Sequence, residues 1–246
     1  MPNIEINGLN TYYEAHGDGP PLMLLHGGFG NAPSMSPMTD ILSKHYKVYV
    51  PERRGHGHTA DPGEINYELM TDDTVGFMAA LGIEKARVVG YSDGAIICLY
   101  LGMRHPGIVE RMVPVSANYH WNGLTEHMRA IFEKSTPQAM AAILPDEVKY
   151  YNENSPDGPD HFAVFFDKMQ KLFLSQPDLT TGELAAIRVP TLVLAADRDL
   201  MTIEHTVEMH KAIEGSQLCV IPGANHGLVF DRADEVCAAA MRFLGG

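Results

Sequence analysis

Gly90-Tyr91-Ser92-Asp93-Gly94 is the stretch that decides the fold of this chain. The apolar, β-branched run Ala86-Arg87-Val88-Val89 precedes it, and an apolar run from Ala95 to Leu101 follows it. This order predicts a buried strand, a sharp turn and a buried helix, the setting in which a Gly-x-Ser-x-Gly turn exposes its serine at the edge of a sheet. Because the helix begins directly after Ser92, free backbone N–H groups and the positive end of the helix dipole would face the serine hydroxyl.

The rest of the chain alternates between short apolar strands and helical patterns. Asn7-Gly8 predicts a hairpin turn within residues 3–16. Further strands are predicted at residues 21–25, 47–50, 87–89, 111–115, 192–195 and 217–221, and helices at residues 34–43, 66–81, 94–104, 205–213 and 233–243. The alternation predicts the α/β class, with a mostly parallel twisted sheet that carries helices on both faces.

Between two of these strands the alternation stops. Residues 119–184 read as helical and irregular, without a convincing strand. We therefore predict a helical cap at 119–184 and a core domain made of 1–118 and 185–246. Such an insertion would lie over the carboxyl edge of the sheet, where ligands bind in open α/β sheets.

The bulk composition narrows the function classes. The chain has 246 residues, a formal net charge of −13 and no basic run, which disfavours binding to nucleic acid or to an anionic membrane surface. It contains no apolar stretch long enough to cross a bilayer, and its first residues do not read as a secretion signal. The three cysteines, Cys98, Cys219 and Cys237, are far apart, so we expect free thiols and a reducing cytoplasm.

A serine hydroxyl becomes a useful nucleophile when a general base lies within hydrogen-bond reach and a third group orients that base. After the Gly-x-Ser-x-Gly turn (the elbow), Asp197-Arg198-Asp199 follows one predicted strand, and His226 lies in a glycine-flanked loop after the last strand. The chain order serine, acid, histidine is that of a known hydrolytic triad. We predict Ser92 as nucleophile and His226 as base. Asp199 is favoured as the acid because a turn residue can reach sideways, whereas Asp197 is expected to bond local backbone N–H groups.

An oxyanion hole requires two backbone N–H donors that are already in position. The N–H of Asp93, next to the nucleophile, is the first candidate. The second should come from the loop His26-Gly27-Gly28-Phe29-Gly30, with Gly28 as first choice and Phe29 as second.

With these residues in place, the chain resembles the α/β-hydrolase superfamily over nearly its whole length. Matching segments are Leu24–Gly28, Arg54–Thr59, Gly90–Gly94, Asp197–Asp199 and Gly223–His226. The resemblance implies hydrolysis of an ester, thioester, lactone or amide through an acyl-enzyme without a cofactor. It assigns the same three residues, Ser92, Asp199 and His226, by position.

Two positions depart from the common pattern of the superfamily. Glu52 stands where an aspartate is usual, and we expect it to keep a structural role. Asp93 follows the nucleophile, where an apolar residue or glutamine is frequent. Ser-Asp-Gly is similar to the branch that contains valacyclovir hydrolase, in which this aspartate is associated with a substrate amino group. The alternative is that Asp93 simply stabilises the first turn of its helix.

The expected substrate is a small, neutral, fairly apolar ester, because no Arg or Lys cluster lies near the motifs. Phe29, Asp93 and Trp121 are the predicted substrate-binding residues, and most cap aromatics are expected to pack rather than bind. No metal site is predicted, because His56 and His58 lack a recognisable ligand set. The oligomeric state stays open.

Other activities remain open from the sequence. An amino-acid ester hydrolase, a lactonase, a carbon–carbon bond hydrolase and a perhydrolase would all use the same serine triad. A ligand receptor could also retain this fold and pocket without turnover. Dehalogenases and epoxide hydrolases are disfavoured, because they carry an aspartate where this chain has Ser92.

Overall fold

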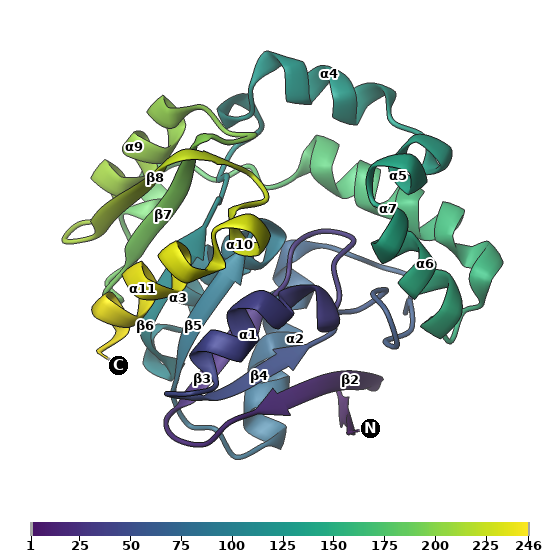
Figure 1. The fold of residues 1–246 in the computed structure, drawn as a ribbon, viewed down its shortest axis with the longest axis horizontal. Coiled ribbons are helices and arrows are strands. Elements are labelled where there is room, and N and C mark those ends of the chain that lie inside the picture. Colours follow the sequence, from purple (N-terminus) through teal and green to yellow (C-terminus); the bar gives the residue numbers. More distant parts are fainter. Residues whose placement is uncertain (1, 246) are drawn as a thin grey trace.

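An eight-stranded sheet lies at the centre of the computed structural model, which describes residues 2–245 (Figure 1). The strand order is β1-β2-β4-β3-β5-β6-β7-β8, in which β1 and β2 pair antiparallel and β3 to β8 run parallel. The strands are β1 (Asn3–Ile6), β2 (Leu9–His16), β3 (Pro21–Leu25), β4 (Lys47–Pro51), β5 (Ala86–Tyr91), β6 (Val109–Val115), β7 (Leu192–Arg198) and β8 (Gln217–Asn225). The predicted hairpin and the mostly parallel sheet are confirmed.

Helices cover both faces of this sheet, as predicted. One face carries α1 (Ser36–Leu42), α10 (Leu228–Asp231) and α11 (Ala233–Leu244), and the other carries α2 (Tyr67–Ala80), α3 (Asp93–Arg104), α8 (Thr181–Leu184) and α9 (Ile203–Ala212). Successive residues of β3 serve both faces. Leu22 and Leu24 join the core under α1 and α11, while Met23 and Leu25 join the core under α2 and α3. This explains why β3 is a continuous apolar run rather than an alternating one.

The last two strands extend further than the sequence predicted. The sequence predicts that the last strand ends at residue 221, but residues 222–224 also belong to β8. Gly223 adopts a φ of +71°, and the pairing with β7 shifts register between Ala196 and Arg198. A glycine at positive φ allows such an irregularity without ending the strand.

Residues 116–191, between β6 and β7, form five α-helices, and four of them lie together. These four are α4 (Glu126–Lys134), α5 (Pro137–Ile143), α6 (Pro145–Asn154) and α7 (Phe162–Ser175), and in Figure 1 they form a teal and green layer along the top and right-hand side of the view. Their N-termini show the expected capping chemistry. The hydroxyls of Thr125 and Thr136 accept hydrogen bonds from backbone N–H groups in the first turns of α4 and α5. The short α8 falls within the predicted cap range but packs against α3 and α9.

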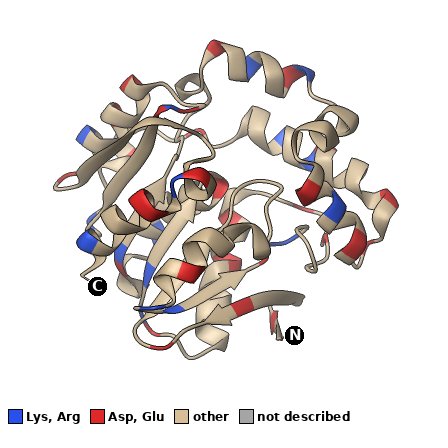
Figure 2. Ribbon diagram, viewed as in Figure 1, with Lys and Arg blue, Asp and Glu red and all other residues tan. Residues whose placement is uncertain are grey.

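Charged residues are dispersed over the molecule. In Figure 2, Lys and Arg positions are scattered among Asp and Glu positions on both helical layers and on α4 to α7. Within residues 2–245, no helix has both the length and the hydrophobicity needed to cross a membrane.

Candidate active site

The turn between β5 and α3 holds Ser92 in a strained conformation. Its backbone has φ of 53° and ψ of −115°, a region that non-glycine residues rarely occupy. The flanking glycines are required by space. A Cβ atom on Gly90 would lie 2.1 Å from the Gly94 carbonyl oxygen, and a Cβ on Gly94 would lie 2.3 Å from the Leu25 carbonyl oxygen. The Gly-x-Ser-x-Gly sequence is therefore the one that lets β5, α3 and β3 approach this closely.

Three predicted residues from distant parts of the chain meet at this turn. The Nε2 atom of His226 lies 3.1 Å from the Ser92 hydroxyl oxygen, and its Nδ1 atom lies 2.6 Å from Oδ1 of Asp199. The Asp199 side chain is 1% exposed and that of His226 is 19% exposed. A buried carboxylate, an imidazole and a serine hydroxyl in this order can move a proton away from the serine.

The Asp199 carboxylate is held by several donors besides His226. The Ser116 hydroxyl donates to Oδ2, and the backbone N–H of Leu200 donates to Oδ1 over 2.8 Å. Burial alone raises the pKa of Asp199, but these hydrogen bonds and the nearby imidazole outweigh burial, so its pKa lies below the usual value. The group is therefore a carboxylate at neutral pH.

The neighbouring Asp197 behaves differently from the prediction. It was expected to bond local backbone N–H groups, yet it is exposed, and within residues 2–245 its carboxylate accepts no hydrogen bond. Asp199 takes that role as well, since it also accepts from the Ala196 N–H at 3.3 Å. The reason is that β7 continues through Arg198, which keeps Asp197 on the strand and leaves Asp199 as the first residue of the turn.

Sequence reasoning missed two supporting side chains. Ser116 follows β6 directly, has a φ of +56° and donates to Asp199. Tyr91 donates its hydroxyl to the His226 carbonyl oxygen over 2.9 Å and so ties the histidine loop to the elbow. A small polar residue at the end of the strand between β5 and β7 was the available signal for Ser116. No sequence signal pointed to the Tyr91 contact.

The three residues predicted as oxyanion donors have backbone N–H groups that are free within the described part of the chain. Within residues 2–245, the backbone N–H groups of Gly28, Phe29 and Asp93 donate to no protein acceptor. All three residues line the same cavity as Ser92 and His226. Phe29 has a φ of +57°, and its ring packs among the aromatic rings of α7.

Asp93 combines deep burial with an unpaired oxygen. The residue is 5% exposed, and within residues 2–245 its Oδ2 atom has no hydrogen-bond partner. Burial raises its pKa to about 6, and the positive charge of Arg53 and contributions from Tyr67 and His226 oppose this rise. The carboxyl group lies against the loop at residues 26–30, because a Cβ atom on Gly28 would be 3.0 Å from Oδ2.

A cavity of about 440 Å³ opens onto Ser92. The helices α4 and α5 contribute apolar walls through Met128, Ile131, Phe132, Met140 and Ile143. Its acidic lining residues are Asp93 and Glu147, and within residues 2–245 no lysine or arginine lines it. Phe29 and Asp93 are thus in the predicted position, whereas Trp121 is not a lining residue. The Trp121 ring packs behind Phe132, with 6.5 Å between ring centroids.

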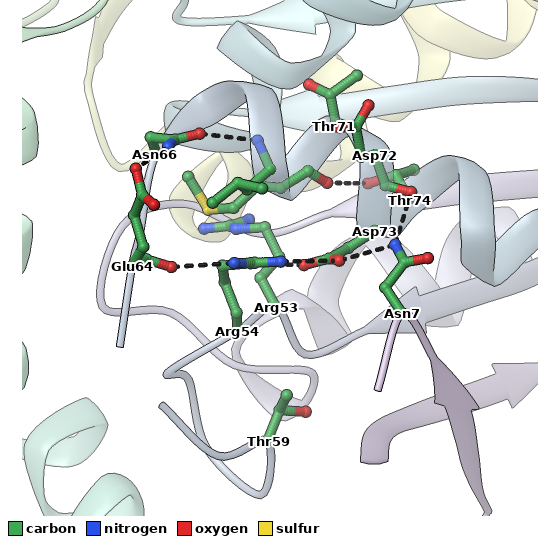
Figure 3. A network of polar contacts seen from close by, with 12 residues as sticks. Asn7, Arg53, Arg54, Thr59, Glu64, Asn66, Thr71, Asp72, Asp73 and Thr74 are labelled. Atoms are coloured by element: carbon green, nitrogen blue, oxygen red, sulfur yellow. Dashed lines mark hydrogen bonds and ion pairs between the residues drawn. The ribbon is translucent and has the colours of Figure 1, made fainter. Parts of the chain in front are cut away.

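Glu52, the first residue after β4, links three segments around the site. Glu52 is fully buried and accepts from the N–H groups of Ala32 and His58 and from the Tyr150 hydroxyl of α6. The structural role predicted for Glu52 is therefore confirmed. Figure 3 shows the neighbouring Arg54 between Glu64 and Asp73; its guanidinium group bonds to both Asp73 oxygens, at 2.6 and 2.9 Å.

The alpha/beta hydrolase family profile matches residues 22–240, which includes every residue of the triad geometry described above. The chain belongs to the α/β-hydrolase family. Among curated relatives, the putative carbamate hydrolase RutD of Agrobacterium fabrum is 23% identical, covering 95% of this chain and 97% of RutD. The human serine hydrolase BPHL is 26% identical, covering 98% of this chain and 85% of BPHL.

Solved structures agree on the fold of this α/β-hydrolase. The enol-lactonase from Burkholderia xenovorans superimposes with a TM-score of 0.79 at 24% identity, and both chains are covered completely. At this identity the likeness concerns the fold alone. The relatives carry different activities in their names, so the family membership makes this chain a hydrolase and leaves its substrate open.

Proposed function

We propose that this hydrolase cleaves small, apolar carboxylic esters through an acyl-enzyme formed on Ser92. The observation that carries the proposal is the continuous relay from Asp199 through His226 to Ser92, with contacts of 2.6 and 3.1 Å, at the floor of an apolar cavity. The nucleophile and base are within hydrogen-bond distance, and the base is oriented by a buried carboxylate.

The proposed mechanism has two halves. Ser92 attacks the ester carbonyl carbon while His226 takes the serine proton, and His226 then returns that proton to the leaving alcohol. Water, deprotonated by His226, next attacks the acyl carbon; the bond to the Ser92 oxygen breaks, the acid is released, and His226 returns the proton to Ser92. Asp199 holds the imidazole in the tautomer that carries its proton on Nδ1 and stabilises the imidazolium cation.

The backbone N–H groups of Gly28 and Asp93 are proposed to hold the negative charge that develops on the carbonyl oxygen. Their lack of protein acceptors supports this role, because donors that are unpaired and fixed need no rearrangement when the charge forms. Phe29 stays the second choice for the donor from this loop.

The cavity supports the substrate class. Its walls are mostly apolar, and its charged lining residues are acidic, so an acyl chain or aryl group is favoured over a substrate with a free carboxylate. The three cysteines are free thiols, which supports the expectation of a reducing cytoplasm. Cofactor-free catalysis remains part of the proposal.

A second candidate is an ester that carries an ammonium group, such as an amino-acid ester. The specific observation in its favour is the buried Oδ2 atom of Asp93, which has no hydrogen-bond partner within residues 2–245, in a residue that lines the cavity next to Ser92. An ammonium group would supply the missing donor and a compensating charge.

The experiment compares initial rates for p-nitrophenyl acetate, butyrate and octanoate with the rate for an amino-acid ester. Wild-type protein and Ser92→Ala are measured side by side. Turnover that Ser92→Ala abolishes supports the proposal, and the chain-length profile reports the size of the cavity. Absence of turnover on every ester would contradict it and direct attention to carbon–carbon hydrolysis or ligand binding.

A further inference from the structure

The carbonyl group of Gly27 is unusually well supplied with donors. Its oxygen accepts from Nη2 of Arg53 at 2.9 Å, from the Gly30 N–H at 3.1 Å and from Nδ1 of His26 at 2.8 Å. The His26 ring is neutral, because burial keeps its pKa well below the usual value. Its Nε2 atom accepts from the Arg53 backbone N–H, which leaves Nδ1 as the donor.

This carbonyl belongs to the same peptide unit as the N–H of Gly28. In a trans peptide the C=O and N–H bonds point in opposite directions, and the Gly27–Gly28 bond is trans. With the oxygen directed at Arg53 and His26, the Gly28 N–H is directed to the other side, where Gly28 lines the cavity. Donors on the oxygen also polarise the peptide and strengthen its N–H as a donor.

Arg53 is buried, at 4% exposure, and makes a second contact with this loop. Its Nη1 atom donates to the His26 carbonyl oxygen, which also accepts from the Gly94 N–H of α3 at 3.1 Å. The His26 carbonyl oxygen therefore joins the loop at residues 26–30 to the start of the helix that supplies the other donor, and the guanidinium group holds that carbonyl in place. Burial lowers the Arg53 pKa to about 10, while the negative charge of Asp93 raises it, so the group remains charged at neutral pH.

We propose that Arg53 is a positioning residue of the oxyanion hole, which holds the Gly27–Gly28 peptide with its carbonyl inward and the Gly28 N–H toward the reacting carbonyl. The Asp93 carboxylate balances the buried guanidinium charge, while the Asp93 backbone supplies the second donor. This inference rests on the proposed function, since an oxyanion hole has a purpose only if an oxyanion forms. It adds a side chain that neither touches the substrate nor belongs to the relay.

The adjacent arginine offers a matched control. Arg54 is also buried, at 9% exposure, and is paired with Asp73, yet its contacts are with α2 and the Glu64 carbonyl (Figure 3). Loss of Arg54 should therefore cost stability without disturbing the Gly27–Gly28 peptide.

The test uses the full-length protein with Arg53→Gln, Arg53→Lys and Arg54→Gln. For each variant, kcat and KM are measured with p-nitrophenyl butyrate, and inhibition constants are measured for a trifluoromethyl ketone and the methyl ketone of the same chain length. The Ser92 oxygen bonds to the trifluoromethyl ketone carbon, its proton passes to His226, and the ketone oxygen becomes an oxyanion. The methyl ketone remains trigonal and reports binding without that charge.

We expect Arg53→Gln to lower kcat on the order of 10- to 100-fold with little change in KM, and trifluoromethyl ketone affinity to fall by a similar factor. Methyl ketone affinity should stay within about 2-fold of wild type, as should all kinetic values of Arg54→Gln. Arg53→Lys keeps the charge but cannot donate to both carbonyls in a fork, so its losses should be intermediate. This variant carries the test if Arg53→Gln does not fold.

The inference is overturned if folded Arg53 variants bind both ketones as wild type does, or lose activity no more than Arg54→Gln. In those cases the wild-type enzyme still hydrolyses esters, and the proposed function stands. Wild-type protein that neither hydrolyses the ester nor forms the ketone adduct would overturn the proposed function itself, together with this inference.

Discussion

At Asp199, one carboxylate accepts from His226, from the Ser116 hydroxyl and from the N–H groups of Ala196 and Leu200. An amide at this position would present an NH₂ group to some of these donors. It would also favour the imidazole tautomer that has its proton on the wrong nitrogen. The chemical value of Asp199 thus lies in being an acceptor on both oxygens.

Asp199→Asn should therefore lower kcat on the order of 10³- to 10⁴-fold while the protein stays folded. Steady-state kinetics on p-nitrophenyl butyrate, with circular dichroism to check folding, measures this effect. Asp197→Asn is the matched control, because it removes the same charge two residues away from an exposed side chain. A larger loss in the Asp197 variant would reverse the assignment of the acid.

Asp93→Asn addresses whether the side chain recognises substrate or balances Arg53. We expect similar losses of kcat/KM on a plain ester and an amino-acid ester, on the order of 10-fold, because the lost charge partner of Arg53 affects both. The ratio of the two values is the measurement. A loss confined to the amino-acid ester would instead support the ammonium role and change the proposed substrate.

At the scale of elements, two polar clusters fasten α6 and α7 to the loop after β4. The Asp61 side chain, which is fully buried, accepts from His161 at 2.9 Å and from Lys168 of α7. The Tyr150 hydroxyl of α6 donates to Glu52 at 3.0 Å. Both contacts join residues that are about a hundred positions apart in sequence, and they hold α6 and α7 against the loop after β4.

Asp61→Asn should lower the free energy of unfolding by about 1–3 kcal/mol, because hydrogen bonds to a charged acceptor are lost. Burial raises the Asp61 pKa, but Lys168 and His161 outweigh it and hold the pKa below 3.8. The stabilisation is therefore present above pH 3.8 and is lost as pH falls through the lower, folded value. Urea unfolding at several pH values measures it, with the exposed Asp160→Asn as control. Equal stability of the two variants at neutral pH would contradict the assignment.

At the scale of the whole molecule, buried histidines couple folding to pH. Burial lowers the pKa of His56 to about 3, that of His205 to about 4 and that of His26 well below 6.5. These groups take up protons on unfolding once the pH falls below 6.5. Asp93 works in the opposite direction, because its folded pKa of about 6 means that it binds a proton before the unfolded chain does.

The three histidines outnumber Asp93, so unfolding takes up protons on balance as the pH falls from about 6 toward 4, and the free energy of unfolding should fall with it. Denaturant unfolding at closely spaced pH values measures the slope, and Asp93→Asn should make it steeper by about 1.4 kcal/mol per unit. Constant stability from pH 6 to 4.5 would show that these histidines titrate normally in the folded protein.

The sequence predicted the sheet, the two helical layers and the elbow because each rests on a local pattern: apolar runs, helical spacing and forced glycines. It also predicted Ser92, Asp199 and His226 as the triad, since each follows a strand. Contacts between segments that are far apart in the sequence have no such local pattern, so they could not be predicted. Trp121 was predicted to bind substrate, but Phe132 lines the cavity and the Trp121 ring packs behind it, a contact that the sequence does not reveal. Arg53 went unnoticed because its partners are backbone carbonyls, which every residue type carries.

The central claim is that Ser92, activated by His226, forms a covalent intermediate, and intact-protein mass spectrometry with peptide mapping tests it most directly. Wild-type protein treated with a fluorophosphonate ester should gain one adduct, mapped to Ser92, and His226→Ala should react far more slowly. Ser34→Ala is the control, because Ser34 lines the same cavity and its hydroxyl donates to the Asn31 carbonyl oxygen rather than to a histidine, and it should react as wild type does. An unmodified wild-type protein, or an adduct on another residue, would contradict the account.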